Sequence, residues 1–242
     1  MRIFLAGATG AVGKRLVPLL LDAGHQVVGT TRSTTKEGAL RSTGVEPVVV
    51  DVFDAPALSR AVSAARPDVV INQLTDLPPG LDPSRMAEGS RRTDHIRKQG
   101  TEHLVAAALA SGAHRLVAQS IAWLYAAGPQ PHSENDLLDI DAPGTRATVA
   151  GLAALERLTL SSPPIEGVVL RYGHLYGPGT GADLGGEAPS LHVDAAASAA
   201  LLAIEKARPG IYNIAEACEY LSTEKAQRGF GFDSSFRSTA QA

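Results

Sequence analysis

Residues 3–13 read IFLAGATGAVG, and this stretch decides the fold. Its first four residues are apolar and predict a short buried strand, and a helical pattern begins after the glycines. Gly7 allows a tight turn, and Gly10 lets the backbone approach a phosphate group at the positive end of the helix. Gly13 lets the helix pack closely on the strand. The order of strand, glycine turn and helix predicts a dinucleotide-binding turn, although a glycine turn without a ligand has the same appearance.

Short apolar runs recur along the chain, with stretches of helical period between them. In the first helix, Leu16, Leu19, Leu20 and Ala23 fall on one face, and Gly24 suits a left-handed cap at its end. The alternation predicts an α/β fold, a Rossmann-type doubly wound parallel sheet with a small C-terminal substrate-side extension. The predicted strands cover residues 3–6, 26–29, 47–50, 69–71, 116–118 and 167–170.

The length of 242 residues suits one NAD(P)-binding domain over 1–242, in which residues 173–242 contribute a reduced substrate-side region. The pattern there predicts a helix over 193–206 and a strand over 210–214. Loops at the carboxyl ends of parallel strands build the ligand crevice, so the irregular, Pro- and Gly-rich segments are expected to wall the site. These segments are residues 76–89, 128–144 and 173–191.

Composition excludes several classes of partner. The formal net charge of −3 gives no general attraction to nucleic acid or to an anionic membrane, and the pair Arg91-Arg92 fits a solvated helix end. The single cysteine, Cys218, rules out an intramolecular disulfide and favours a cytoplasmic location. We expect neither an export signal nor a membrane span, because no apolar run has the necessary length.

The end of the second strand indicates which dinucleotide binds. An acidic residue there holds the ribose 2′-hydroxyl of NAD, whereas an arginine accommodates the 2′-phosphate of NADP. Here the strand runs into Thr31, Arg32 and Ser33 with no carboxylate. We therefore expect NADP(H) to be favoured over NAD(H), the alternative being that Arg32 merely faces solvent.

The chain resembles the extended short-chain dehydrogenase/reductase family, in its NAD-dependent epimerase/dehydratase branch. The resemblance covers nearly the whole chain and rests on motifs in the family's order: residues 7–13, Asp51-Val52, Gln119-Ser120, the stretch RYGHLYGPG at 171–179, LHVD at 191–194 and GIYNI at 210–214. It implies a small-molecule substrate and a cofactor held by Gly7, Thr9, Gly10, Ala11, Val12, Gly13, Arg32, Asp51, Val52, Leu74, Gln119 and Tyr172.

The chain departs from this family where its chemistry is done. In the family, a tyrosine of a Tyr-x-x-x-Lys pair exchanges the substrate proton, and the lysine lowers its pKa and holds the nicotinamide ribose. Ser120 matches the family's serine. The tyrosine position falls at Ala147 or Thr148 and the lysine position at Gly151 or Leu152. Neither residue of the pair is present.

Three functions remain open at this stage. The first is an oxidoreductase or epimerase/dehydratase-like enzyme acting on a carbonyl or hydroxyl compound, in which Ser120 orients the substrate oxygen and another residue supplies the proton. The candidate donors are His174, Tyr125, Tyr172 and Tyr176, with His174 preferred because an imidazole titrates near neutrality. The second is a non-catalytic NADP(H)-binding or redox-sensing module. A serine hydrolase built on Ser120 fits poorly, because no nucleophile elbow surrounds it.

Two further expectations concern metals and assembly. No histidine pair has the helical ligand spacing of a metal site, so we expect no metal. The alanine-rich segments 101–110 and 148–160 resemble the two helices that pair between subunits in the family, and their small side chains allow close approach. We therefore expect a homodimer.

Overall fold

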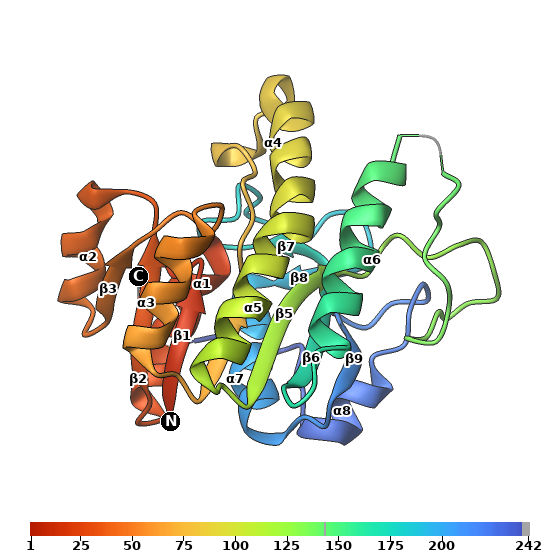
Figure 1. The fold of residues 1–242 in the computed structure, drawn as a ribbon. Coiled ribbons are helices and arrows are strands. Elements are labelled where there is room, and N and C mark those ends of the chain that lie inside the picture. The colour runs from red at the N-terminus through yellow and green to blue at the C-terminus, as the bar shows by residue number, and fades with distance from the viewer. Residues whose placement is uncertain (143, 239–242) are drawn as a thin grey trace.

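The computed structural model describes residues 1–142 and 144–238, which are built around an open sheet with helices on both faces (Figure 1). Seven strands pair in the order β3-β2-β1-β4-β5-β6-β9, and every neighbouring pair is parallel. This is the predicted Rossmann-type arrangement. The strands are β1 Arg2–Ala6, β2 Gln26–Thr31, β3 Glu46–Val49, β4 Val69–Asn72, β5 Arg115–Ile121, β6 Glu166–Tyr172 and β9 Gly210–Ile214.

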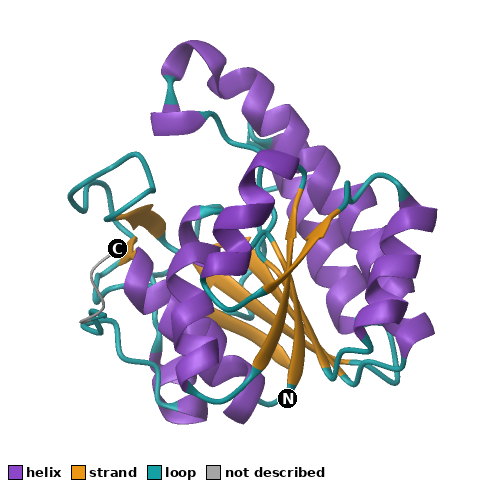
Figure 2. Ribbon diagram, turned by 90° about the vertical axis from the view of Figure 1, so that its left-hand side faces the viewer, coloured by secondary structure: helices purple, strands orange, loops and turns teal. Residues whose placement is uncertain are grey.

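Helices connect the strands and leave the sheet between two layers, as Figure 2 shows. A separate two-stranded parallel ribbon, β7 with β8, lies in the C-terminal part. In chain order these elements are α1 Ala11–Asp22, η1 Thr34–Lys36, α2 Glu37–Ser42, α3 Ala55–Ala65, η2 Pro79–Leu81, α4 Pro83–His95, η3 Ile96–Gly100, α5 Thr101–Ser111, α6 Arg146–Leu160, β7 His174–Tyr176, β8 Ser190–His192, α7 Val193–Lys206 and α8 Glu224–Phe230.

The two faces of the sheet carry separate apolar cores. Successive residues of a strand point to opposite faces, so Ile3 and Leu5 of β1 pack with α1, α7 and α8, whereas Phe4 and Ala6 pack with α3 and α5. All four side chains are 2% exposed or less. Burial on both faces explains why the strands read as continuous apolar runs.

Helix α1 follows the predicted glycine turn. Gly10 is its N-cap, and Gly24 beyond its end has a φ of +78°, which is the predicted left-handed cap. The buried face is made by Val12, Leu16 and Leu20 with their neighbours, while Ala23 is exposed. The sequence pattern placed Ala23 on the same face as Leu16 and Leu20, which was wrong. The helix ends at Asp22, so Ala23 lies one residue beyond it.

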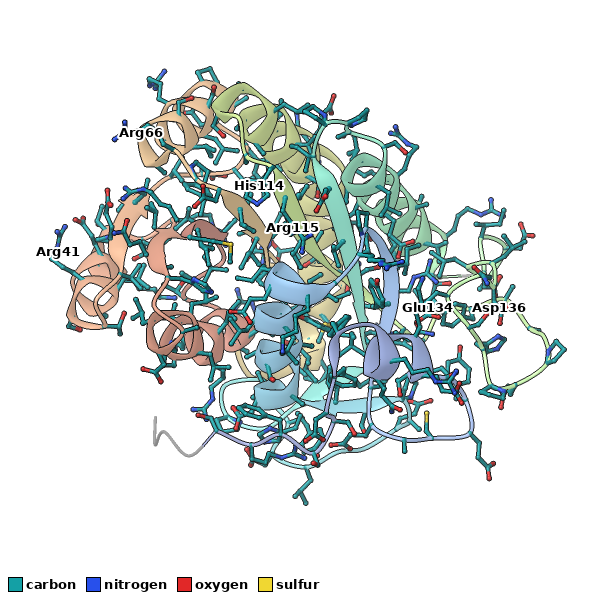
Figure 3. The ribbon with its side chains drawn as sticks, turned by 90° about the horizontal axis from the view of Figure 1, so that it is seen from below. Arg41, Arg66, His114, Arg115, Glu134 and Asp136 are labelled. Atoms are coloured by element: carbon teal, nitrogen blue, oxygen red, sulfur yellow. The ribbon has the colours of Figure 1, made fainter. Side chains whose placement is uncertain are left out.

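Arg115, labelled in Figure 3, lies at the end of the sheet opposite the carboxyl ends of the strands. Its Nη1 donates to the carbonyls of Ala203 and Ile204 in the last turn of α7, at 3.0 and 3.1 Å. A cation at this end satisfies carbonyls that the helix itself leaves unpaired. Among the described residues, no helix is long and apolar enough to cross a membrane.

Candidate functional site

A cavity of about 1410 Å³ runs along the carboxyl ends of the strands, where doubly wound sheets bind their ligands. Its wall includes Gly7 after β1, Arg32 after β2, Gln73 after β4, Gln119 on β5 and His174 after β6. The volume exceeds the roughly 300–1,000 Å³ that is typical for one small ligand. It is large enough for a dinucleotide and a second molecule.

The glycines of the turn have two different roles, one in packing and one in leaving space for a ligand. Gly7 has a φ of +93°, and a Cβ there would lie 2.8 Å from the Gln73 carbonyl oxygen. A Cβ on Gly13 would lie 2.2 Å from the Gly7 carbonyl oxygen, so both glycines are required by packing. Gly10 differs, because its φ is −76° and a Cβ would approach only the Gly7 oxygen, at 3.3 Å. Any larger side chain at Gly10 would extend into the cavity.

The residues present fit a dinucleotide. The backbone at Gly10 opens α1 toward the cavity without a side-chain cap, so the helix N-terminus presents N–H groups to an anion. Gln73 is 5% exposed and lines the cavity, yet its Oε1 is buried without a hydrogen-bond partner among the described residues. A ligand hydroxyl would satisfy this oxygen.

Most of the predicted cofactor residues lie on the cavity wall. Two do not: Val12 is buried in the core, and Gly13 packs against the turn. Their part is to fix the position of α1. The predicted residues that line the cavity are Gly7, Thr9, Gly10, Ala11, Arg32, Asp51, Val52, Leu74, Gln119 and Tyr172.

Arg32 at the cavity mouth is paired with a carboxylate that the sequence interpretation did not identify. Its two terminal nitrogens donate to Asp76, and Arg92 Nε lies 3.0 Å from the same carboxylate. The hydrogen bond from Arg32 lowers the pKa of Asp76, so the carboxylate stays ionised. Arg32 is thus neither free nor simply solvent-facing, and its side chain is 51% exposed.

Ser120 and Tyr125 belong to a buried network and not to the cavity wall. Ser120 is 0% exposed, and its hydroxyl donates to Glu156 Oε1 at 2.7 Å. Arg171 donates twice to Glu156 and once to the Tyr125 hydroxyl, which in turn donates to Asn213 at 2.5 Å. Burial raises the pKa of Tyr125. Both hydroxyl groups are thus hydrogen-bonded inside the fold and away from the cavity wall, and the catalytic part expected of the two residues stays a prediction.

His174, the preferred donor of the sequence prediction, lies on the cavity wall. Its ring stacks on Trp123, with centroids 3.8 Å apart and an interplanar angle of 22°, and both residues line the cavity. Burial lowers the pKa of His174 below its ordinary value, although Glu187 opposes the shift. The imidazole is therefore neutral at pH 7. The pair forms a flat aromatic wall, and Trp123 was not identified from the sequence.

The two tyrosines near β6 and β7 are also engaged. Tyr172 is 1% exposed; its hydroxyl donates to the Ala196 carbonyl at 3.1 Å, and burial raises its pKa well above the ordinary value. The Tyr176 hydroxyl donates to Glu216 at 2.5 Å, and this hydrogen bond raises its pKa. Both residues line the cavity, but neither hydroxyl is a ready acid near neutral pH.

The position of the missing tyrosine is held by a hydrogen-bonded cluster. Thr148 lines the cavity and donates to Asp94 Oδ2 at 3.0 Å, while Arg97 donates to Asp94 Oδ1 at 3.1 Å. Leu152, four residues after Thr148, is fully buried. Asp94 and Arg97 were missed from the sequence, since they lie where α4 passes into a π-helical turn, which has no simple sequence signal.

Two of the three irregular segments wall the cavity as predicted. The third, residues 128–144, contributes only Gly144 among its described residues. Residues 132–134 lie instead beside β9 and the segment after it: Glu134 accepts from the Asn213 backbone N–H, and the His132 backbone pairs with the backbone of Tyr220 and Ser222. Figure 3 shows Glu134 and Asp136 on this side. Among the described residues, no cluster of three or more His, Cys, Asp or Glu could hold a metal ion.

The chain is similar in sequence to a known protein family and to a curated reductase. The sequence profile of the NAD dependent epimerase/dehydratase family matches residues 3–191. The 3-diazoavenalumate denitrifying reductase of a Streptomyces species is 43% identical, over 89% of this chain and 76% of that protein.

Solved structures share the fold at low sequence identity. The UDP-glucuronic acid 4-epimerase of Bacillus cereus, in complex with UDP-glucuronic acid and NAD, has a TM-score of 0.77 at 17% identity, over 98% of this chain and 95% of that chain. The dTDP-glucose 4,6-dehydratase DesIV of Streptomyces venezuelae, with NAD bound, has a TM-score of 0.78 at 16% identity, over 98% and 92%.

Proposed function

The chain belongs to the NAD dependent epimerase/dehydratase family, and from this premise we propose that it is an NADPH-dependent reductase that acts on a small aromatic diazo compound. The family and the reductase relative make it an NAD-dependent enzyme of the oxidoreductase or epimerase type. The diazo substrate is suggested by the name of the Streptomyces relative, which specifies both a diazo compound and a denitrifying reduction.

The observation that carries the proposal is the cluster at the tyrosine position. Reduction of a carbonyl, or oxidation of a sugar hydroxyl, needs a group that gives or takes a proton at oxygen. Here the Thr148 proton is held by Asp94, and Ser120 and Tyr125 are enclosed in the buried network. A reaction that develops no charge on oxygen suits such a site better.

Reduction of a diazonium group meets this condition. When bound, NADPH would supply a hydride, which adds to the terminal nitrogen of an arenediazonium ion and gives a neutral aryl diazene. Loss of N₂ then breaks the C–N and N–H bonds, and the hydrogen moves to the ring carbon to give the arene. The positive charge of the ion is cancelled by the hydride, so the step requires no acid. A neutral His174 avoids repelling a cationic substrate.

The cavity wall supports an aromatic ligand. The stacked rings of Trp123 and His174 offer a flat face, and Leu124 and Leu184 add apolar surface nearby on the wall. We assign residues 173–187 to the substrate side, supported by Tyr176, Leu184 and Glu187 on the wall. The NADPH preference is supported by Arg32 at the end of β2.

A matched substrate panel tests the function. Purified protein and NADPH are incubated with a stable benzenediazonium salt, the benzaldehyde with the same ring substituents and a nucleotide sugar, and NADPH loss and product mass are recorded. Gly10→Val protein and protein-free samples correct for direct reaction with NADPH. We expect reduction of the diazonium ion above both controls and none of the aldehyde. Turnover of only the aldehyde or the nucleotide sugar would overturn the proposal.

A further inference from the structure

One cationic side chain of the cavity wall differs from the others. Among the described residues that line the cavity, Arg97 is the only lysine or arginine that is mostly buried, with 11% of its side chain exposed. Arg32, Lys36 and Arg91 on the same wall are exposed. Removing a guanidinium from water is costly, so its retention at this point requires compensating contacts.

Arg97 is fixed by its ion pair with Asp94, but only part of its hydrogen-bonding capacity is used. It lies in the π-helical turn η3 and makes one hydrogen bond, from Nη1 to Asp94 Oδ1 at 3.1 Å. Its Nε and Nη2 donate to none of the described residues. Burial lowers the pKa of Arg97, yet a guanidinium stays protonated at neutral pH. Two charged donors are therefore left for a ligand.

Arg97 lies next to Gly151 on α6, one of the two positions at which the family resemblance expects a lysine. Helix α6 approaches η3 closely at Gly151, where a Cβ would lie 3.4 Å from the Asp94 carbonyl oxygen and 3.5 Å from Arg97 Cβ. Thr148, one turn earlier on α6, bonds to the same Asp94. Leu152 is buried and does not line the cavity. The cation missing from α6 is thus replaced by one on the neighbouring element.

We propose that Arg97 takes over the part of the absent lysine and holds the ribose hydroxyls of the nicotinamide half of the dinucleotide. Helix α6 packs beside β5 and β6, the half of the sheet away from Arg32, which marks the adenosine half. Asp94 already neutralises the guanidinium, so its remaining N–H groups suit neutral hydroxyls better than a second anion. The inference rests on the proposed function only in requiring a dinucleotide.

Binding measurements without any substrate test this role. Titration calorimetry is run with NADPH, with NADH and with ADP, which lacks the nicotinamide riboside, on wild-type, Arg97→Met, Arg97→Lys and Lys98→Met proteins. Because Arg97→Met leaves the Asp94 carboxylate without its cation, the double variant Asp94→Asn/Arg97→Met is included, and thermal unfolding confirms that each protein is folded. Lys98 supplies the matched control, as an exposed cation of the same π-helical turn that does not line the cavity.

We expect Arg97→Met and the double variant to bind NADPH and NADH at least tenfold more weakly, by the same factor, and ADP unchanged. Arg97→Lys should recover part of the loss, and Lys98→Met should change little. Unchanged NADPH and NADH affinity in the folded double variant would overturn the proposal, as would an equal loss for ADP. Neither result depends on diazo reduction, so failure here is distinct from failure of the substrate panel.

Discussion

The Arg32 guanidinium donates two hydrogen bonds to the Asp76 carboxylate, 2.7 Å from Nη2 to Oδ1 and 3.2 Å from Nη1 to Oδ2. The arginine follows β2 and lines the cavity, and the aspartate comes from the segment after β4, so the contact joins two segments at the carboxyl ends of the strands. The 2′-phosphate of NADP would compete with Asp76 for the same donors.

This competition predicts opposite effects for the two residues. Arg32→Ala should weaken NADPH binding by about 1–3 kcal/mol, the range of a charge-assisted hydrogen bond, and leave NADH nearly unchanged. Asp76→Asn should strengthen NADPH binding, because it removes a negative charge close to the phosphate. Calorimetric titration of both cofactors measures the differences. Equal affinity of the wild-type protein for NADPH and NADH would refute the assignment of Arg32.

Gly10 is predicted to be required for binding but not for folding. Gly10→Val should abolish dinucleotide binding with little loss of thermal stability, because its φ suits any residue and its side chain would occupy the cavity. Gly38→Val is a matched control, since a Cβ at Gly38 meets nothing within 4 Å and the residue lies outside the cavity wall. Near-normal affinity of Gly10→Val for NADPH would show that the turn has only a structural part.

The buried network predicts stability effects without catalytic ones. Ser120→Ala should cost about 1–2 kcal/mol in the free energy of unfolding, because it removes one of the two hydrogen bonds that the buried Glu156 Oε1 accepts, the other coming from Arg171 Nε. Arg171→Met should cost about 3–5 kcal/mol, because it leaves the buried Glu156 carboxylate without its cation. Urea unfolding gives both values. If Ser120→Ala remained fully stable but lost turnover, Ser120 would regain the substrate-orienting part expected from the sequence.

His174 is predicted to act as a wall and not as an acid. Because burial lowers its pKa, the imidazole is neutral at pH 7 and above, and turnover should stay flat between about pH 7 and 8. An acid role would instead make turnover rise as the pH falls through the lowered pKa. His174→Phe should retain most activity by keeping the stacking on Trp123, whereas His174→Ala should lose it. Loss of activity in both variants, together with such a rise, would favour the acid.

The homodimer expected from the resemblance stays a prediction. Ala106 and Ala110 on α5 and Ala150 and Ala153 on α6 are exposed, as is Leu109. A dimer mass in light scattering at micromolar concentration, converted to a monomer by Ala153→Glu, would support pairing through these helices. A monomer mass for the wild-type protein would contradict it.

The parallel sheet could be predicted because its signal is local and repeated. The apolar runs are continuous, Gly7 and Gly13 have no sterically acceptable substitute, and Gly24 ends α1 as expected. The side of the molecule on which a loop packs is harder to predict, because it depends on contacts with residues far away in the sequence. The segment 128–144 has the composition of a site wall, but of its described residues only Gly144 lines the cavity, and its Glu134 accepts from the Asn213 backbone N–H on β9.

The catalytic side of the site was harder to predict for the same reason. The sequence places Ser120 at the end of a strand, but its environment depends on Glu156 and Arg171, which come from other elements. Arg97 enters the cavity wall through a π-helical turn that shifts the register of the helix. A sequence motif that expects a lysine on α6 cannot identify an arginine that lies on η3 instead.

Transfer of deuterium from NADPH labelled at nicotinamide C4 to a benzenediazonium ion tests the central claim most directly. The arene product is analysed by mass spectrometry and NMR after incubation with wild-type protein, with the Gly10→Val protein as the control for direct reaction. We expect the arene to carry one deuterium, on the ring carbon that lost N₂, and to form faster than with the control protein. Thr148→Val should keep the rate of this labelled product within a few-fold of the wild-type rate. An unlabelled arene, or product formed no faster than with Gly10→Val, would contradict the claim.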